Sequence, residues 1–329
     1  MFRWLYGLYF LGLEAPSFTF IDLAPRAFFD PPVLSPAFLL DAFPAPPFFR
    51  VLDLLAVAAL GLMTVGYRTR TATLSLFVLR LVGASFHYSF GKIDHDILAL
   101  AILPCMWLAD WGRHYSLDAR SRQDEVVGTA RGTALFAVLL AFGMLTAGLP
   151  KAMVWIDFDL ETSGILSWYY PQLATLDRQR LLAPYVGALP ALLREGGDYL
   201  GPLLELSAFA ALLHSRRAWL GWLLLASVFH LINVLLLNIN FISYAVLYCC
   251  FANLEALGPF VRRWLPGFIA AAAIMASWHL LTRALWVGGP VVFAAGPAES
   301  EVAGLWSSLP VFAFVVVLLG SNLAAKRAV

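Results

Sequence analysis

Long apolar segments recur along the whole chain, and short polar turns separate them. A membrane-crossing helix needs about 20 predominantly apolar residues, because each residue adds about 1.5 Å of length. Ten segments approach or meet that length, although the first is short and Pro104 interrupts the fourth. They lie at residues 2–14, 50–67, 71–90, 96–110, 132–151, 200–215, 218–238, 241–256, 264–284 and 305–323. The pattern predicts an all-α, polytopic integral membrane helix bundle of nine to ten spans, with residues 1–329 as a single transmembrane domain.

The composition agrees with a membrane protein and argues against other classes. The chain is 61% hydrophobic and only 13% charged, and its mean hydropathy is +0.78. A soluble domain of 36.2 kDa cannot bury that much apolar surface. The net charge of +1 and the lack of a basic stripe give no indication of nucleic acid as a partner. The first residues lack the pattern of a cleaved signal peptide, so we interpret them as a short or clipped first span.

Basic residues are unevenly distributed between the two sides of the predicted bundle. Eight of the 22 arginines and lysines lie on one side, and Arg80 lies inside a span. The other thirteen cluster in short turns, which the positive-inside rule assigns to the cytoplasm. These thirteen are Arg3, Arg68, Arg70, Arg113, Arg120, Arg122, Arg131, Arg216, Arg217, Arg262, Arg263, Lys326 and Arg327. We therefore predict that both termini are cytoplasmic.

The opposite side carries two long loops that do not resemble solvated polar loops. Residues 15–49 are rich in proline and phenylalanine, and residues 152–199 hold several tryptophan and tyrosine residues between short apolar pieces. Aromatic, amphipathic segments of this kind lie in the headgroup region or fold back as re-entrant lids. We expect the two loops to cover the outer mouth of the bundle.

Four ionisable residues inside the predicted spans share one level of the membrane. His87 lies roughly 6 Å and His230 roughly 12 Å below the outer surface, at about 1.5 Å per residue. Lys151 ends the fifth span on the outer side, and Glu205 enters the sixth from that side. Ionisable groups are costly inside a membrane and mark functional sites there. A desolvated lysine is also a usable base at neutral pH.

Each of these residues also has a structural interpretation. A single histidine inside a membrane is most often a hydrogen-bond partner between helices, and Lys151 alone is more often an anchor that extends toward the surface. Arg80, two turns before His87, could pair with a carboxylate. We expect Glu205 to pair with Arg80, or to form a hydrogen bond in the neighbourhood of its own helix, rather than to pair with Lys151. A contact between Lys151 and Glu205 would count against Lys151 as a catalytic base. His279 lies inside a span and could have either kind of role.

The cysteines carry no predicted chemistry. Cys105, Cys249 and Cys250 all lie inside predicted spans, and we interpret them as structural thiols. Their spacing does not match a zinc site or a redox motif, so we predict no metal.

At four segments the sequence resembles a known family. They are residues 86–118, which open with FHYS and close with HYSLD; residues 145–159, LTAGLPKAMVWIDFD; residues 203–209, LLELSAF; and residues 229–252, which begin with FHLIN. In order and spacing they resemble the transmembrane portion shared by vitamin K-dependent gamma-carboxylases and their bacterial relatives, the HTTM (horizontally transferred transmembrane) proteins. The likeness covers about residues 50–255 and leaves the spans at 264–284 and 305–323 outside it.

The resemblance implies a quinol-dependent enzyme in a bacterial inner membrane, with its site on the outer side. In the carboxylases the lysine matched by Lys151 deprotonates reduced vitamin K, and the histidines matched by His87 and His230 belong to the same cavity. A menaquinol-type quinol would be the cofactor, with O2 and CO2 as co-substrates and no metal. We expect the remaining cavity residues to be Arg80, Tyr88, Trp155, Glu205 and Asn233.

The chain also departs from the carboxylases. Pro150 stands where the animal enzymes have a second lysine, and no large luminal domain follows the last span, so propeptide-directed carboxylation is not expected. Some bacterial relatives act in the maturation of a secreted peptide. Two hypotheses therefore stand: a quinol-dependent membrane enzyme with Lys151 as base, or a non-catalytic membrane protein that handles a lipid or a secreted peptide. The expected partners are membrane lipid, a quinol, and a secreted peptide or partner membrane protein.

Overall fold

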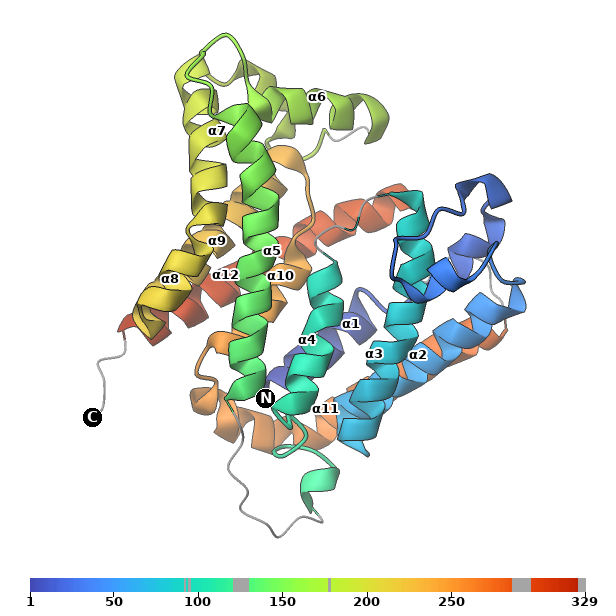
Figure 1. The fold of residues 1–329 in the computed structure, drawn as a ribbon. Coiled ribbons are helices and arrows are strands. Elements are labelled where there is room, and N and C mark those ends of the chain that lie inside the picture. The colour runs from blue at the N-terminus through green and yellow to red at the C-terminus, as the bar shows by residue number, and fades with distance from the viewer. Residues whose placement is uncertain (92, 94–95, 121–129, 177–178, 286–296, 325–329) are drawn as a thin grey trace. The chain divides into compact units, whose positions relative to one another are not determined.

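A computed structural model describes residues 1–329 except 92, 94–95, 121–129, 177–178, 286–296 and 325–329 (Figure 1). The structure is 78% helical, and no strand occurs among the described residues. Its α-helices are α1 (Phe2–Gly12), α2 (Pro47–Val65), α3 (Thr69–His87), α4 (Ile97–Leu108), α5 (Arg131–Trp155), α6 (Gly164–Leu176), α7 (Ala191–Leu206), α8 (Ala208–His214), α9 (Arg216–Leu237), α10 (Ile242–Tyr248), α11 (Gly258–Ala284) and α12 (Pro297–Ala324).

Each of the ten predicted spans overlaps helical structure, and two of them need correction. In the predicted span 241–256, α10 ends at Tyr248, and the 3₁₀ turn η7 (Cys249–Phe251) follows it. The predicted span 200–215 is two helices, because α7 ends at Leu206 and α8 begins at Ala208. The two long loops also contain helices that the hydrophobic pattern did not separate. The 3₁₀ turns η1 (Thr19–Leu23), η2 (Arg26–Phe28) and η3 (Pro36–Leu39) lie in the first, and α6 lies in the second with η6 (Ala183–Ala188).

Four helical segments in the described part of the chain are long and apolar enough to cross a membrane. They are α2, α5, α9 and residues Glu255–Ala284, which comprise η8 (Glu255–Leu257) and α11. Shorter apolar helices lie at Ile97–Leu108, Ile242–Phe251 and Ser308–Ala324. Length and composition thus support an α-helical membrane protein, and the number of nine to ten spans stays a prediction.

The helices gather into two compact units. Unit 1 comprises Met1–Ala134 with Asn253–Ala295, and unit 2 comprises Leu135–Ala252 with Gly296–Val329. Unit 1 therefore contains α1 to α4 and α11. Unit 2 contains α6 to α10, α12 and nearly all of α5.

Small residues allow close helix crossings in unit 1. A Cβ added at Gly7 of α1 would lie 2.1 Å from Oγ1 of Thr64 on α2, and one at Gly61 of α2 would lie 2.9 Å from Cβ of Ala276 on α11. His279 joins α11 to α1, because its Nε2 lies 2.8 Å from the carbonyl oxygen of Leu11 and must donate to it. This contact gives His279 a structural role.

The chain just after α4 ties three helices of unit 1 together. Arg3, whose residue is only 1% exposed, donates from Nη1 to the carbonyls of Met63 (2.8 Å) and Thr64 (2.6 Å) at the end of α2, and from Nη2 to that of Tyr115 (2.6 Å). Asp118 accepts hydrogen bonds from the backbone amides of Arg68 (2.8 Å) and Thr69 (2.7 Å), and so caps the start of α3.

These contacts change the interpretation of two sequence features. Arg3 is not a solvated charge that flanks a span, because it satisfies carbonyl groups at the C-terminus of α2, where a cation is favourable. The HYSLD close of the first family-like segment, residues 114–118, contributes backbone and side-chain caps in unit 1. Its role in the described structure is architectural.

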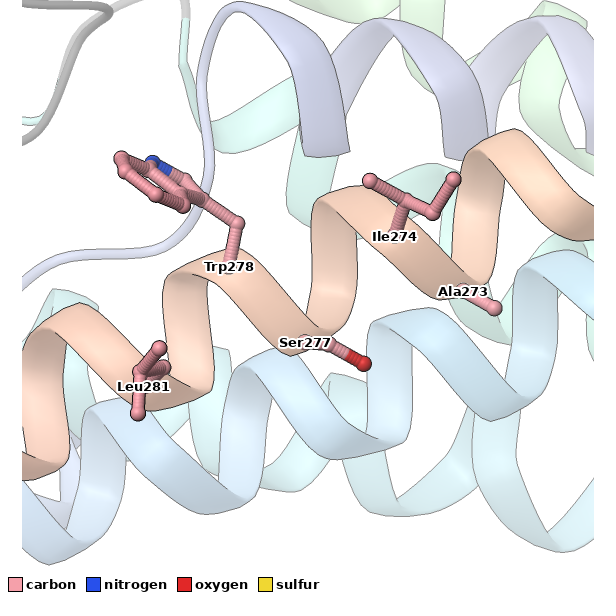
Figure 2. Close-up of a pocket in the computed structure, with 5 residues that line it drawn as sticks. All are labelled: Ala273, Ile274, Ser277, Trp278 and Leu281. Carbon is pink, nitrogen blue, oxygen red and sulfur yellow. The ribbon is translucent and has the colours of Figure 1, made fainter.

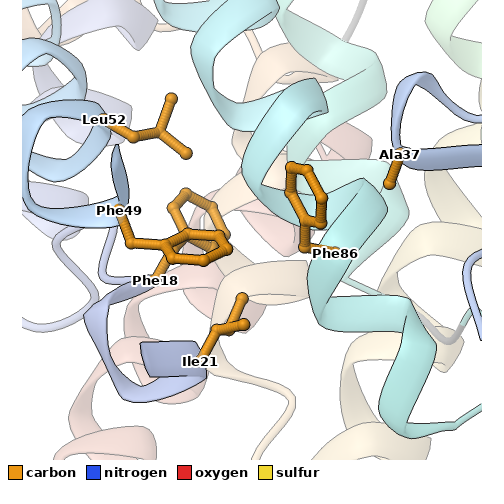
Figure 3. Packing of buried hydrophobic residues seen from close by; sticks show 6 residues of the cluster. All are labelled: Phe18, Ile21, Ala37, Phe49, Leu52 and Phe86. Atoms are coloured by element: carbon orange, nitrogen blue, oxygen red, sulfur yellow. The ribbon is translucent and has the colours of Figure 1, made fainter. Parts of the chain in front are cut away.

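The proline- and phenylalanine-rich loop packs onto α2 and α3. Figure 3 shows Phe18, Ile21 and Ala37 of the loop gathered with Phe49, Leu52 and Phe86 of the two helices, which together form a buried hydrophobic cluster. Asp53, fully buried on α2, accepts hydrogen bonds from the amides of Phe18 (2.7 Å) and Thr19 (3.2 Å). The loop is therefore held at its start by a carboxylate and along its length by apolar contacts.

In unit 2, α7 has a buried stripe that carries three acidic residues. Glu195, Asp198 and Glu205 share this stripe with Gly201 and Pro202. Asp198 accepts from the amides of Gly164 (2.9 Å) and Ile165 (2.7 Å) and caps α6, which lies crosswise to α7 (Figure 1). Burial raises the pKa of Asp198, and the hydrogen bonds from the start of α6 oppose that rise.

Candidate functional site

The centre of the candidate site is an ion pair between α5 and α7. Lys151 Nζ lies 2.5 Å from Glu205 Oε1. The lysine side chain is 33% exposed and the glutamate side chain only 6%. Trp155, one turn after Lys151 on α5, presents its ring 5.9 Å from Nζ, within reach of a cation–π interaction. The second carboxylate oxygen, Glu205 Oε2, is buried and has no hydrogen-bond partner among the described residues.

This pairing corrects one expectation and weakens another. Glu205 pairs with Lys151, so the expected pair of Glu205 with Arg80 is wrong. Arg80 instead donates to the hydroxyl of Tyr6 (2.9 Å) and stacks over Phe10 in unit 1. Because Glu205 occupies the amine of Lys151, the geometry counts against Lys151 acting alone as the catalytic base.

A glycine lets the two helices meet at the pair. Gly148 lies one turn before Lys151, so both occupy the same face of α5. A Cβ added there would lie 2.8 Å from Cβ of Glu205 and 3.2 Å from both Pro202 O and Leu206 N of α7. The backbones approach closely because position 148 has no side chain. Gly148 was not among the predicted site residues.

Gly148→Ala should weaken unit 2 and loosen the ion pair. The new methyl group meets backbone atoms of α7, which cannot rotate away, so the helices must separate at a cost of about 1–3 kcal/mol. Thermal unfolding of the purified protein measures this. Gly221→Ala is the matched control, because a Cβ at Gly221 of α9 meets nothing within 4 Å and should leave the protein equally or more stable. Equal melting temperatures for the two variants would contradict the close approach.

His230 lies in the same unit and bonds to a tyrosine. The histidine residue is 3% exposed, and its Nε2 lies 2.9 Å from the hydroxyl of Tyr248, which is fully buried on α10. The ring also packs against Phe241 and Tyr244, with centroid distances of 4.5 and 5.0 Å. Unit 2 thus holds two polar pairs: Lys151 with Glu205 between α5 and α7, and His230 with Tyr248 between α9 and α10.

Tyr248 was missed in the sequence. It stands in an apolar run, and tyrosine is common in such runs, so only the contact with His230 distinguishes it. Asn233, which was expected in the cavity, is half-buried one turn after His230. Its backbone carbonyl accepts a hydrogen bond from the amide of Asn238 at the end of α9. Ser227 is fully buried and donates to Leu223 of its own helix (2.8 Å).

The other predicted site residues belong to unit 1. His87 is exposed at the end of α3, between the rings of Phe20 (5.5 Å) and Tyr88 (5.6 Å). Arg80 lies two turns earlier on the same helix, and its charge acts on Glu14, a carboxylate that the sequence analysis did not single out. That His87, Tyr88 and Arg80 share a cavity with Lys151 stays a prediction.

A separate surface depression lies on α11. Figure 2 shows that Ala273, Ile274, Ser277, Trp278 and Leu281 line it and that all five come from one helix. Its lining includes no charged side chain and no predicted site residue, so it does not resemble a catalytic cleft. Among the described residues no group of three or more His, Cys, Asp or Glu side chains could hold a metal ion.

The geometry, then, is a buried carboxylate with one oxygen on an ammonium group and the other oxygen without a hydrogen-bond partner among the described residues, in a unit that also holds a buried tyrosine–histidine pair. Such an arrangement can receive a proton from a weakly acidic hydroxyl group and hold the resulting anion next to a cation. Comparison with known proteins does not name this arrangement: no family model, no curated protein and no solved structure matches the chain.

Proposed function

We propose that this chain is an integral membrane enzyme that deprotonates a membrane quinol at the Lys151–Glu205 pair. One observation carries the proposal. Two of the four family-like segments, residues 145–159 and 203–209, contribute one partner each to a contact between residues 54 positions apart. The resemblance to the vitamin K-dependent carboxylases supplies the quinol as the substrate class.

The proposed step moves one proton. A quinol hydroxyl donates to Glu205 Oε2, the O–H bond breaks, and the carboxylate becomes a carboxylic acid. The quinolate oxygen keeps the electron pair and is stabilised by the Lys151 ammonium group. Lys151 therefore acts as the counter-cation and Glu205 as the proton acceptor, which modifies the expectation of a neutral lysine. Oxidation of the quinolate would require O2 as the co-reactant, and CO2 would be needed only for a carboxylation.

The proposal includes a membrane arrangement. All nine to ten predicted spans cross a bacterial inner membrane, both termini are cytoplasmic, and the pair faces the outer side. The support is the bias of basic residues toward one side and the position of Lys151 at the end of α5 away from Arg131. Tyr248 and His230 would adjust the charge around Glu205 from the protein interior.

Glu205→Gln should abolish quinol turnover while quinol binding changes little. The amide keeps the shape and the contact to Lys151 but cannot accept a proton at neutral pH. The measurement is menaquinol-dependent O2 uptake and epoxide formation by purified protein in nanodiscs, with quinol binding followed by mass spectrometry of the extracted lipid. Lys151→Arg should retain a measurable part of the turnover, because the cation stays in place.

Two outcomes would contradict the mechanism. If Glu205→Gln turns over quinol at the unaltered rate, Glu205 is not the proton acceptor. If Lys151→Arg is inactive and Glu205→Gln is active, the lysine is itself the base.

The second candidate is a non-catalytic protein that binds a lipid or a secreted peptide. The short distance between Lys151 and Glu205 favours it, because a close ion pair also joins two helices with no chemistry. In that case the unaltered protein would show no quinol turnover, and Lys151→Arg and Glu205→Gln would retain the same co-purified ligand.

A further inference from the structure

The tip of the proline- and phenylalanine-rich loop exposes an unusual amount of apolar surface. Between Val33 and Leu40 five large apolar side chains are exposed: Val33 (72%), Leu34 (96%), Phe38 (53%), Leu39 (85%) and Leu40 (46%). No charged residue occurs from Pro31 to Leu40. Contiguous exposed apolar surface of this kind marks a site of interaction with a protein or a membrane.

The same segment has an inward side that holds it in place. Ala37 is fully buried and belongs to the cluster of Phe18, Phe49 and Phe86 in Figure 3. Short-range hydrogen bonds also fix its backbone, from Ser35 N to Pro32 O (3.1 Å) and from Leu40 N to Ala37 O (3.0 Å). The exposed side chains are thus presented by an ordered turn that is packed on α2 and α3.

Leu34 combines exposure with an unfavourable backbone conformation. Its φ is +68°, in the left-handed region, where a Cβ is penalised and glycine is preferred. A glycine at this position would remove both the penalty and the exposed side chain. Contacts within the described structure therefore do not explain a leucine here, and a benefit has to come from the surroundings. Phe158, 84% exposed with φ of +61°, repeats this combination in the loop after α5.

We propose that residues 33–40 form a hydrophobic wedge that inserts into the lipid leaflet next to the start of α2. The loop leads directly into α2, a helix apolar enough to span a membrane, so its tip emerges at a membrane surface. The absence of charge and the outward leucines fit the boundary between headgroups and acyl chains, where apolar side chains are buried by roughly 5–10 Å. The non-helical backbone fits that boundary and not the hydrocarbon core, because polar backbone groups there need partners.

A fluorescent reporter at Leu34 tests the wedge. The variant Leu34→Cys is labelled with the environment-sensitive dye NBD in phosphatidylcholine–phosphatidylglycerol nanodiscs. The native Cys105 and Cys249 are buried, and unaltered protein labelled in parallel corrects for background from the three native cysteines. The control is Asp41→Cys, also exposed and in the same loop. We expect the Leu34 reporter to emit at shorter wavelength than the Asp41 reporter, and nitroxides on the lipid acyl chains should quench most of its emission. Aqueous iodide should instead quench the Asp41 reporter.

Two results would overturn the proposal. A Leu34 reporter that iodide quenches as strongly as the Asp41 reporter would place the tip in water. A Leu34 reporter that neither iodide nor lipid nitroxides can reach would instead place it against protein, such as a second copy of the chain.

Because the dye is itself apolar, a second variant tests whether the native side chains and not the dye cause the insertion. Leu34→Asp with the reporter at Leu39→Cys should shift the Leu39 emission toward that of water, because a charge at the tip opposes insertion. An unchanged Leu39 emission, in protein whose melting temperature in detergent is unaltered, would also contradict the wedge. This test does not depend on quinol chemistry, so it can fail while the proposed function stands.

Discussion

Replacing Lys151 with methionine should destabilise unit 2 by about 3 kcal/mol, the low end of the range for breaking a buried pair, because the lysine is partly exposed. The variant leaves Glu205, a buried carboxylate, with no partner on either oxygen. Glu205→Gln should cost only about 1 kcal/mol, because a lysine that is 33% exposed can still reach water. The two members of one ion pair should therefore differ in their effect on stability.

The double variant Lys151→Met with Glu205→Gln gives the decisive comparison. Removing both charges should recover most of the stability lost in Lys151→Met, since no unpaired charge stays buried. Cys249 of unit 2 is 2% exposed, so its reaction with a thiol-specific dye during heating follows the unfolding of that unit. A double variant as unstable as Lys151→Met would show that the lysine stabilises the unit through its aliphatic chain and not through its charge.

Arg3→Met should destabilise unit 1 by about 1–3 kcal/mol, the cost of one unsatisfied buried polar group. It removes the guanidinium donors from the carbonyl oxygens of Met63, Thr64 and Tyr115. The Met63 oxygen still accepts from the amide of Gly66 and the Tyr115 oxygen from the indole of Trp4, so the loss falls mainly on Thr64. The reactivity of Cys105, which is fully buried in unit 1, reports the unfolding temperature.

Arg70→Met is the matched control for Arg3→Met. Arg70 is also an arginine near a helix terminus, but it is exposed and stacks on the ring of Trp107 at 4.8 Å. Its loss should cost about 1 kcal/mol or less. Similar effects of the two substitutions would mean that the hydrogen bonds of Arg3 do not contribute as described.

The positions of the helices could be predicted from the sequence because apolar length and periodicity are local properties. The break between α7 and α8 at Ser207 was missed, since the residues on both sides of it are apolar and favour helix. Lys151, Glu205 and His230 were recognisable one by one, because an ionisable residue inside an apolar segment stands out.

Their partners were not predictable in the same way. Whether Glu205 meets Lys151 depends on the register of α5 against α7, and the close approach that Gly148 allows cannot be read from either segment alone. The role of Tyr248 and the capping role of Arg3 also depend on partners that are distant in the sequence. The acceptors of Arg3 are backbone carbonyls, which every residue has. A carbonyl group leaves no signature in a sequence.

The contact between Arg3 and Tyr115 has a consequence for the biogenesis of the protein. These residues are 112 positions apart, so the ribosome must add more than a hundred residues after Arg3 before its last acceptor exists. At about 5–20 residues per second this takes roughly 5–20 s. The acceptors on Met63 and Thr64 are made after about half of that interval, so until Tyr115 follows, the guanidinium group of the nascent first helix has an incomplete set of native ligands. This is the period in which an insertion factor or a chaperone can engage the new chain.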